Sequence, residues 1–152
     1  MREGEKTIVL GLGNLLMGDE GVGVHVIRKL QELELPPEVE PVDGGTAGID
    51  LIPVLKGADR VIIVDAVRAG GEAGSIYRFG PEELEKPLDH LSLHQLSLQE
   101  VLQAATLLGI QPGITIIGVE PKRIALGLEL SKELEEALPR VIEAVQAELQ
   151  VD

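Results

Sequence analysis

The fold is decided by the segment Lys6-Thr-Ile-Val-Leu-Gly-Leu-Gly-Asn-Leu-Leu-Met-Gly-Asp-Glu-Gly21. Its first six residues, Lys6–Gly11, contain the apolar run Ile8-Val-Leu10 and are typical of a buried strand. After Asp19, apolar residues recur at helical spacing, at Val22, Val26, Ile27, Leu30 and Leu33. A buried strand, a glycine-rich turn and an amphipathic helix indicate an α/β protein.

Further strands are expected at Val39–Asp43, Val61–Asp65, Ser75–Phe79 and Gly113–Val119. The 66–74 link is short and glycine-rich, whereas a parallel crossover usually needs about a dozen residues or more. The Ser75–Phe79 strand is therefore expected to run antiparallel to its predecessor. We expect one domain over residues 1–152, an α/β/α three-layer sandwich with a mostly parallel, twisted five-stranded sheet in which one strand is antiparallel.

Three more helices are expected between and after these strands. A short one carries Leu51, Ile52 and Leu55. Ser97 and Glu100 fit a capping box, which predicts that the third helix begins there. Ser131 opens the last helix, and Pro139 is expected to kink it or to mark a new start.

Composition excludes several classes of function. The formal net charge of −13 argues against nucleic acid, because phosphate contacts need clustered Lys and Arg. With no Cys, the chain has no thiolate metal ligand and no Cys nucleophile. No apolar run reaches the roughly 18 residues that a membrane span needs, and no signal-peptide pattern begins the chain. We expect a cytoplasmic protein that does not insert into a membrane.

Three candidate site residues lie at junctions between the expected strands and helices. Glu20 follows the first strand, Asp65 closes the third, and His94 lies just ahead of the third predicted helix. Two carboxylates and an imidazole suit one divalent metal ion with coordination positions left open. The pattern therefore predicts a metal site, at which these three residues are also the candidate catalytic residues.

Other interpretations compete for several polar residues. Asp19 is expected to be the N-cap of the first helix. Asp43 either caps the tight turn at Gly44 or is a substrate-facing carboxylate, a lesser catalytic candidate. His25 is expected at the rim of the first helix, and His90 at an exposed position.

Asp65 also has a purely structural interpretation. A carboxylate that closes an apolar strand is costly to desolvate unless a partner compensates it. Asp59, Arg60 or Arg68 could provide a polar environment for the Asp65 carboxylate, and no metal ion would then be needed to explain it.

A nucleotide-binding domain is the weaker alternative. Gly11-x-Gly13 after a first strand matches the start of a dinucleotide-binding pattern. Leu16 then occupies the position of the third glycine, and Asp19 with Glu20 would bring negative charge toward a pyrophosphate. The chain also lacks His-Glu-x-x-His, Gly-x-Ser-x-Gly and Walker-type sequences.

Five segments taken together resemble the hydrogenase maturation proteases, which process the large subunit of nickel-iron hydrogenases. They are Gly11–Val24, Asp43–Gly48, Val64–Ala66, Ser92–Leu96 and Gly118–Pro121, and they occur in the order found in that family. The resemblance implies a largely parallel five-stranded sheet and metal contacts from Glu20, Asp65 and His94. It also implies an endopeptidase that removes a C-terminal peptide from the precursor after nickel insertion.

The expected function is therefore a nickel-dependent, aspartyl- or metal-assisted endopeptidase whose partner is the precursor of a hydrogenase large subunit. Nickel is expected to arrive with the substrate, and other divalent ions to substitute for it in crystals. Either the metal polarises the scissile carbonyl or a water, or a carboxylate acts as general base. The rival function is a non-catalytic chaperone that checks the metal. The protein itself is expected to be a monomer.

Overall fold

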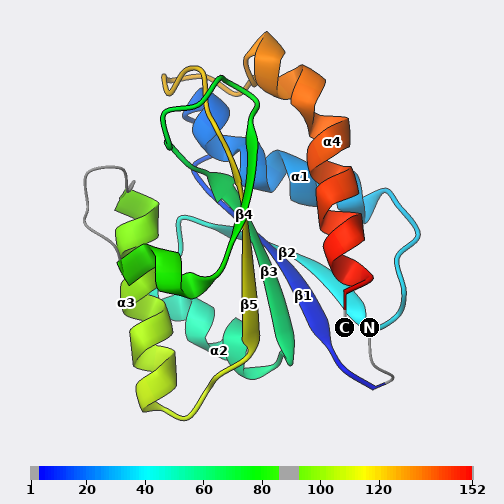
Figure 1. Cartoon of the computed structure of the whole chain (residues 1–152), viewed down its shortest axis with the longest axis vertical. Helices are drawn as coiled ribbons and strands as arrows, with labels where there is room; N and C mark the ends of the chain where they lie inside the picture. The colour runs from blue at the N-terminus through cyan, green and yellow to red at the C-terminus, as the bar shows by residue number, and fades with distance from the viewer. Residues whose placement is uncertain (1–3, 86–92, 152) are drawn as a thin grey trace.

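The computed structural model describes residues 4–85 and 93–151, except for the side chains of Ile49 and of residues 84–85 and 93–97. It contains a five-stranded sheet in the order β2-β1-β3-β5-β4 (Figure 1). The strands are β1 (Thr7–Leu12), β2 (Val39–Gly45), β3 (Arg60–Ala66), β4 (Ile76–Phe79) and β5 (Gly113–Val119). The β1–β2, β1–β3 and β3–β5 pairs are parallel, and β4 pairs with β5 antiparallel. The expected sheet is confirmed.

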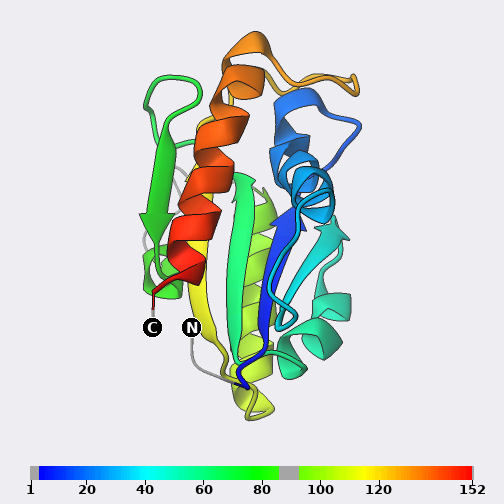
Figure 2. The same cartoon turned by 90° about the vertical axis from the view of Figure 1, so that its right-hand side faces the viewer.

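Helices cover both faces of this sheet (Figure 2). One face packs against α1 (Val22–Gln31) and α4 (Lys132–Leu149), and the other against α2 (Ile52–Lys56) and α3 (Leu93–Leu107). Three 3-10 turns complete the described elements: η1 (Gly18–Gly21), η2 (Ile49–Leu51) and η3 (Pro81–Glu85). The α/β/α sandwich is therefore confirmed, and no helix in the described residues is long and apolar enough to cross a bilayer.

The core consists of two aliphatic layers separated by the sheet. Alternate residues of β3 point to opposite faces, so Ile62 and Val64 join the α1–α4 layer while Val61 and Ile63 join the α2–α3 layer. All six residues of β1 are buried, as a central strand between two helical layers requires.

β4 runs opposite to β3, as expected, but it lies beside β5 at the far edge of the sheet. The 67–75 loop carries the chain across the end of β5, where Gly74 N–H donates to the Glu120 carbonyl and Glu120 N–H donates to that of Ser75. The short link indicated the direction of this strand, and its periodicity indicated its buried face, but neither indicates which strand it will join.

The two helix boundaries predicted from capping residues had different outcomes. Ser131 is the N-cap of α4 and accepts a hydrogen bond from Leu134 N–H at 3.4 Å, and α4 continues through Pro139 as one helix. The capping box at Ser97 is wrong, because α3 already begins at Leu93. No Gly or Pro separates Leu93 from Ser97, so nothing in the backbone prevents the earlier start.

At the amino edge of the sheet, Glu148 fastens the last turn of α4. The residue is 4% exposed, and its carboxylate accepts hydrogen bonds from Arg78 Nε (2.6 Å), Arg78 Nη2 (3.0 Å) and Thr115 Oγ1 (3.0 Å). The Arg60 guanidinium adds bonds to the Glu148 and Val151 carbonyls. These donors, Arg78 first, hold the pKa of Glu148 below its ordinary value despite burial.

Direct backbone contact between glycines sets the position of α1. A side chain at Gly11 would meet the Gly23 carbonyl and the Ile27 side chain, and one at Gly23 would meet the carbonyls of Leu12 and Val64. The first turn of α1 therefore rests on the ends of both β1 and β3. This contact explains Gly11 without any nucleotide.

Replacing Gly23 by Ala should destabilise the protein by about 3 kcal/mol, because the new methyl overlaps two carbonyl oxygens that belong to rigid strands. Gly48→Ala is the matched control, since nothing lies within 4 Å of its Cβ position. We expect its unfolding free energy in urea to stay within about 0.5 kcal/mol of the parent protein. Equal stability of the two variants would contradict the packing described above.

Candidate functional site

The candidate site lies at the carboxyl edge of the sheet, between β1 and β3. The chain leaves β1 toward β2 on one side, while β3 lies on the other, so this is the point at which the strand order reverses. In open α/β sheets, ligands bind in the crevice at such a point. Gly11 pairs with both Asp43 of β2 and Val64 of β3, which brings two of the sequence candidates, Asp43 and Asp65, to this edge.

Asp65 is the buried carboxylate of the site. Its side chain is 2% exposed, and its Oδ1 atom accepts a hydrogen bond from Ala66 N–H at 2.8 Å. Of the residues considered as its structural partners, Arg60 is engaged elsewhere, because its guanidinium binds the end of α4. Asp59 likewise accepts a hydrogen bond from Lys6 N–H. Neither residue therefore explains a carboxylate at the end of β3.

Glu20 belongs to η1, and Gly13 separates its backbone from the Asp65 carboxylate. The Cβ position of Gly13 overlaps the Glu20 carbonyl oxygen and lies 3.6 Å from Asp65 Oδ1. Gly13 also has φ +130°, a conformation that favours glycine. The structure thus brings the turn that carries half-buried Glu20 against Asp65.

Asp43 lies two strands away from Asp65 and is exposed. Its Oδ1 atom accepts a hydrogen bond from Gly45 N–H at 2.9 Å, and Gly45 has φ +50°. This geometry is the turn cap that the sequence offered as one interpretation.

The three histidines differ in what the structure describes. His94 lies in the first turn of α3 rather than ahead of the helix, and its side chain is outside the described part. His90 lies outside the described residues altogether. Among the side chains that are described, no three His, Asp or Glu gather closely enough to hold a metal ion.

His25 lies in α1 and hydrogen-bonds the backbone of Leu128. It is half-buried, as expected for a residue at the rim of the helix. Burial, and then the nearby Arg28 charge, lower the pKa of its imidazole. His25 therefore has a structural role beneath the loop that contains Leu128.

Asp19 is not the N-cap of the first helix. The N-cap positions of η1 and α1 are Met17 and Gly21, and neither makes a side-chain cap bond. Asp19 is fully buried inside η1 and binds the loop between β5 and α4, residues 121–131, here called the 121–131 loop.

Four hydrogen bonds join Asp19 to the 121–131 loop. Its Oδ2 atom accepts from Lys122 N–H (2.9 Å), Arg123 N–H (3.0 Å) and Ser131 Oγ (2.7 Å), and Oδ1 accepts from Ser131 N–H (2.7 Å). The donors lie more than 100 residues away in sequence. A local capping rule therefore had no means of identifying them.

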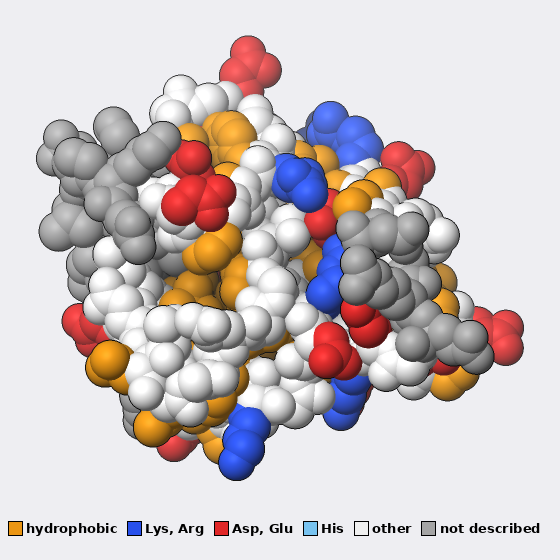
Figure 3. All heavy atoms as spheres, turned by 60° about the horizontal axis from the view of Figure 1, so that its bottom comes forward, with side chains coloured by type: hydrophobic (Ala, Val, Ile, Leu, Met, Phe, Trp, Pro, Cys, Tyr) orange, Lys and Arg blue, Asp and Glu red, His pale blue; other side chains and the backbone are white. Residues whose placement is uncertain are grey.

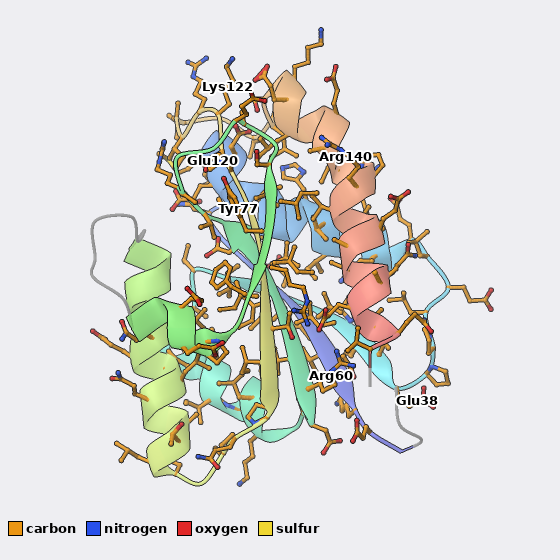
Figure 4. All side chains as sticks on the ribbon, in the orientation of Figure 1. Glu38, Arg60, Tyr77, Glu120, Lys122 and Arg140 are labelled. Carbon is orange, nitrogen blue, oxygen red and sulfur yellow. The ribbon has the colours of Figure 1, made fainter. Side chains whose placement is uncertain are left out.

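Glu120 anchors the opposite loop, which follows Asp65. Its Oε1 atom accepts hydrogen bonds from the Tyr77 hydroxyl (2.7 Å), Ala69 N–H (2.9 Å) and Gly71 N–H (3.0 Å). Figure 4 shows Tyr77 and Glu120 close together near the ends of β4 and β5. Burial alone would raise the pKa of Glu120, but these donors outweigh it and lower that pKa below its ordinary value.

The protein is therefore an open α/β sandwich in which two acidic residues, Glu20 and Asp65, lie at the point where the strand order reverses. A family model described as "Hydrogenase maturation protease" matches residues 24–148. The chain therefore belongs to the hydrogenase maturation protease family.

Relatives and solved structures agree with this assignment. The chain is 35% identical to the hydrogenase 2 maturation protease of Escherichia coli K12, over 95% of this chain and 90% of that protein. It is 37% identical to the hydrogenase expression/formation protein HupD of Thiocapsa roseopersicina, over 94% of this chain. The solved hydrogenase maturating endopeptidase HybD of E. coli superposes with a TM-score of 0.86 at 32% identity, covering 95% of this chain and 92% of that chain.

The chain is shorter than some of these relatives. It spans 58–67% of the length of the curated HupD proteins from four organisms that it matches.

Replacing Asp19 by Ala should lower the unfolding free energy by about 2–4 kcal/mol, because the amides of Lys122, Arg123 and Ser131 lose their shared acceptor. Glu129→Ala, an exposed change on the same loop, is the control and should be nearly neutral. Urea denaturation measures both variants. A neutral effect of Asp19→Ala would show that the 121–131 loop is held by other contacts.

Tyr77→Phe should destabilise the protein by about 2 kcal/mol at pH 7, because ionised Glu120 loses a hydrogen bond. The folded pKa of Glu120 is depressed, so its contribution is present above the ordinary value of 4.5 and lost as the pH falls through the folded pKa. The difference from the parent protein should therefore narrow below pH 4.5. A difference that stays constant in urea titrations across this range would mean that Tyr77 acts through packing alone.

Proposed function

We propose that this protein is an endopeptidase that removes the C-terminal extension of a nickel-loaded precursor of a nickel-iron hydrogenase large subunit. The observation that carries the proposal is the approach of the Glu20 turn to the buried Asp65 carboxylate across Gly13. Family membership supports the hydrolytic part, and the name of the E. coli relative, a hydrogenase 2 maturation protease, supports the substrate class. The reaction would take place in the cytoplasm with a monomeric protease.

In this proposal the nickel ion belongs to the substrate. Glu20, Asp65 and His94 would approach it when the precursor docks at the carboxyl edge of the sheet. Carboxylate oxygens and an imidazole nitrogen form a mixed ligand set that suits a divalent ion of intermediate softness. Recognition of nickel would then ensure that only a loaded precursor is cleaved.

Peptide hydrolysis requires a water molecule to attack the scissile carbonyl carbon while the departing amine gains a proton. The substrate's nickel could polarise the carbonyl or the water. Alternatively, Asp65 or Glu20 could take the proton from the water as a general base. Asp43 is the lesser candidate for that role, because its carboxylate already caps the turn at Gly45.

Asp65→Asn, Glu20→Gln and His94→Ala should each abolish processing while the protein still folds. Each change removes a ligand for the substrate's nickel, and Asn and Gln retain the shape of the carboxylates. His94→Ala should alter stability by no more than about 1 kcal/mol. The measurement is the mass of the nickel-loaded precursor before and after incubation, with thermal unfolding as the test of folding.

His90→Ala is the control for the histidine variant and should process the precursor normally. Full activity of a folded His94→Ala protein would mean that another histidine, or no histidine, contacts the nickel. If the parent protein binds the loaded precursor tightly without any loss of mass, the metal-checking chaperone is the correct function.

A further inference from the structure

Three leucine side chains are exposed on two segments that meet beside the candidate site. Leu16 is 57% exposed, Leu126 is 85% exposed and Leu128 is 61% exposed. Leu16 precedes Glu20 by four residues, and Leu126 and Leu128 belong to the 121–131 loop. In Figure 1 this loop lies at the upper end of the molecule, above the carboxyl ends of the parallel strands.

The backbone holds these leucines in place. Gly127 N–H donates to the Leu16 carbonyl at 2.8 Å, and Gly18 N–H donates to the Gly127 carbonyl at 2.9 Å. Asp19 fastens both ends of the same loop. A partner would therefore meet an apolar surface that is already ordered, so little conformational entropy is lost on binding.

A hollow of about 530 Å³ accompanies the exposed leucines. Arg123, Leu126, Leu128, Glu129 and Ser131 contribute to its lining. Within the described part of the chain, Arg123 has no ion-pair partner, whereas the neighbouring Lys122 pairs with Glu133 at 3.3 Å. The lining thus combines leucines with one carboxylate, Glu129, and with a guanidinium outside any ion pair of the described residues. On a chain of net charge −13, such a guanidinium beside leucines suits an apolar segment that carries a carboxylate.

We propose that Leu16, Leu126, Leu128 and Arg123 form a docking surface for an apolar segment of the hydrogenase precursor that bears an acidic residue. This rests on the proposed function. The precursor is the occupant because the surface is continuous with η1, which carries Glu20. A protein substrate usually buries about 1,200–2,000 Å² in total, so it must cover surface beyond the scissile bond.

A second pair of exposed leucines provides a matched control. Leu107 is 89% exposed and Leu108 is 68% exposed, at the carboxyl end of α3. That end lies at the opposite, lower end of the molecule in Figure 1, and Figure 3 turns it forward and shows hydrophobic side chains on that face. The two pairs share residue type and exposure but differ in their distance from the candidate site.

The test compares Leu126→Ser/Leu128→Ser with Leu107→Ser/Leu108→Ser. Binding of each to the nickel-loaded precursor is measured in a Glu20→Gln background, so that cleavage cannot consume the complex, and is compared with Glu20→Gln alone, which lacks the same nickel ligand. KM and kcat are measured separately with Glu20 intact. We expect Leu126→Ser/Leu128→Ser to raise Kd and KM by about tenfold to hundredfold, with little change in kcat or Tm. The control pair should leave both Kd and KM unchanged. Arg123→Glu should also weaken binding and reduce its dependence on salt.

The possible outcomes separate the two proposals. The docking surface alone is overturned if the parent protein cleaves the precursor but the Kd does not change in Leu126→Ser/Leu128→Ser. It is also overturned if the control pair changes the Kd by as much. A parent protein that binds without cleaving, with a Kd that responds to Leu126 and Leu128, refutes the endopeptidase and retains the surface. Sedimentation that shows self-association lost in Leu126→Ser/Leu128→Ser would identify a contact between copies and overturn the proposal.

Discussion

The close approach of backbone to backbone at Gly11, Gly13 and Gly23 is the constraint on which the rest of the structure depends. Gly23 lets the first turn of α1 rest on the carbonyls that end β1 and β3. Gly13 then leaves no side chain between the Glu20 carbonyl and the Asp65 carboxylate. A single methyl at any of these positions would move the helix away from the sheet, and with it the turn that carries Glu20.

Much of the fold could be predicted because buried strands have a strong local signature. Val61–Asp65 differs from the observed β3 only by one residue at each end, and Gly113–Val119 matches β5. The neighbour of β4 could not be predicted, because alternation within a strand does not depend on which strand lies beside it. The start of α3 was missed because a capping-box pattern also occurs inside helices, and the four residues before Ser97 contain no helix breaker.

For the candidate site, sequence reasoning could locate residues but not their partners. Asp65 could be identified because a carboxylate that closes an apolar strand is costly to desolvate, and Glu20 because it lies between glycines at a junction of strand and helix. The fold brings their segments together. The tethering roles of Asp19 and Glu120 could not be foreseen, since Asp19 binds amides more than 100 residues away and Glu120 binds a loop about 50 residues earlier. Long-range hydrogen bonds of this kind leave no periodic trace in a sequence.

The hydrogen bonds that Asp19 and Glu120 accept from the flanking loops allow the exposed residues at this edge of the sheet to vary during evolution. Asp19 and Glu120 bind mainly backbone amides, so they fix the paths of the flanking loops whatever side chains those loops carry. Residues such as Arg123, whose amide is held while its side chain is exposed, can therefore change without moving the loop. Related chains could acquire new partners by exchanging a few exposed residues on an unaltered frame, and a binding preference could be transplanted in the laboratory by the same exchange.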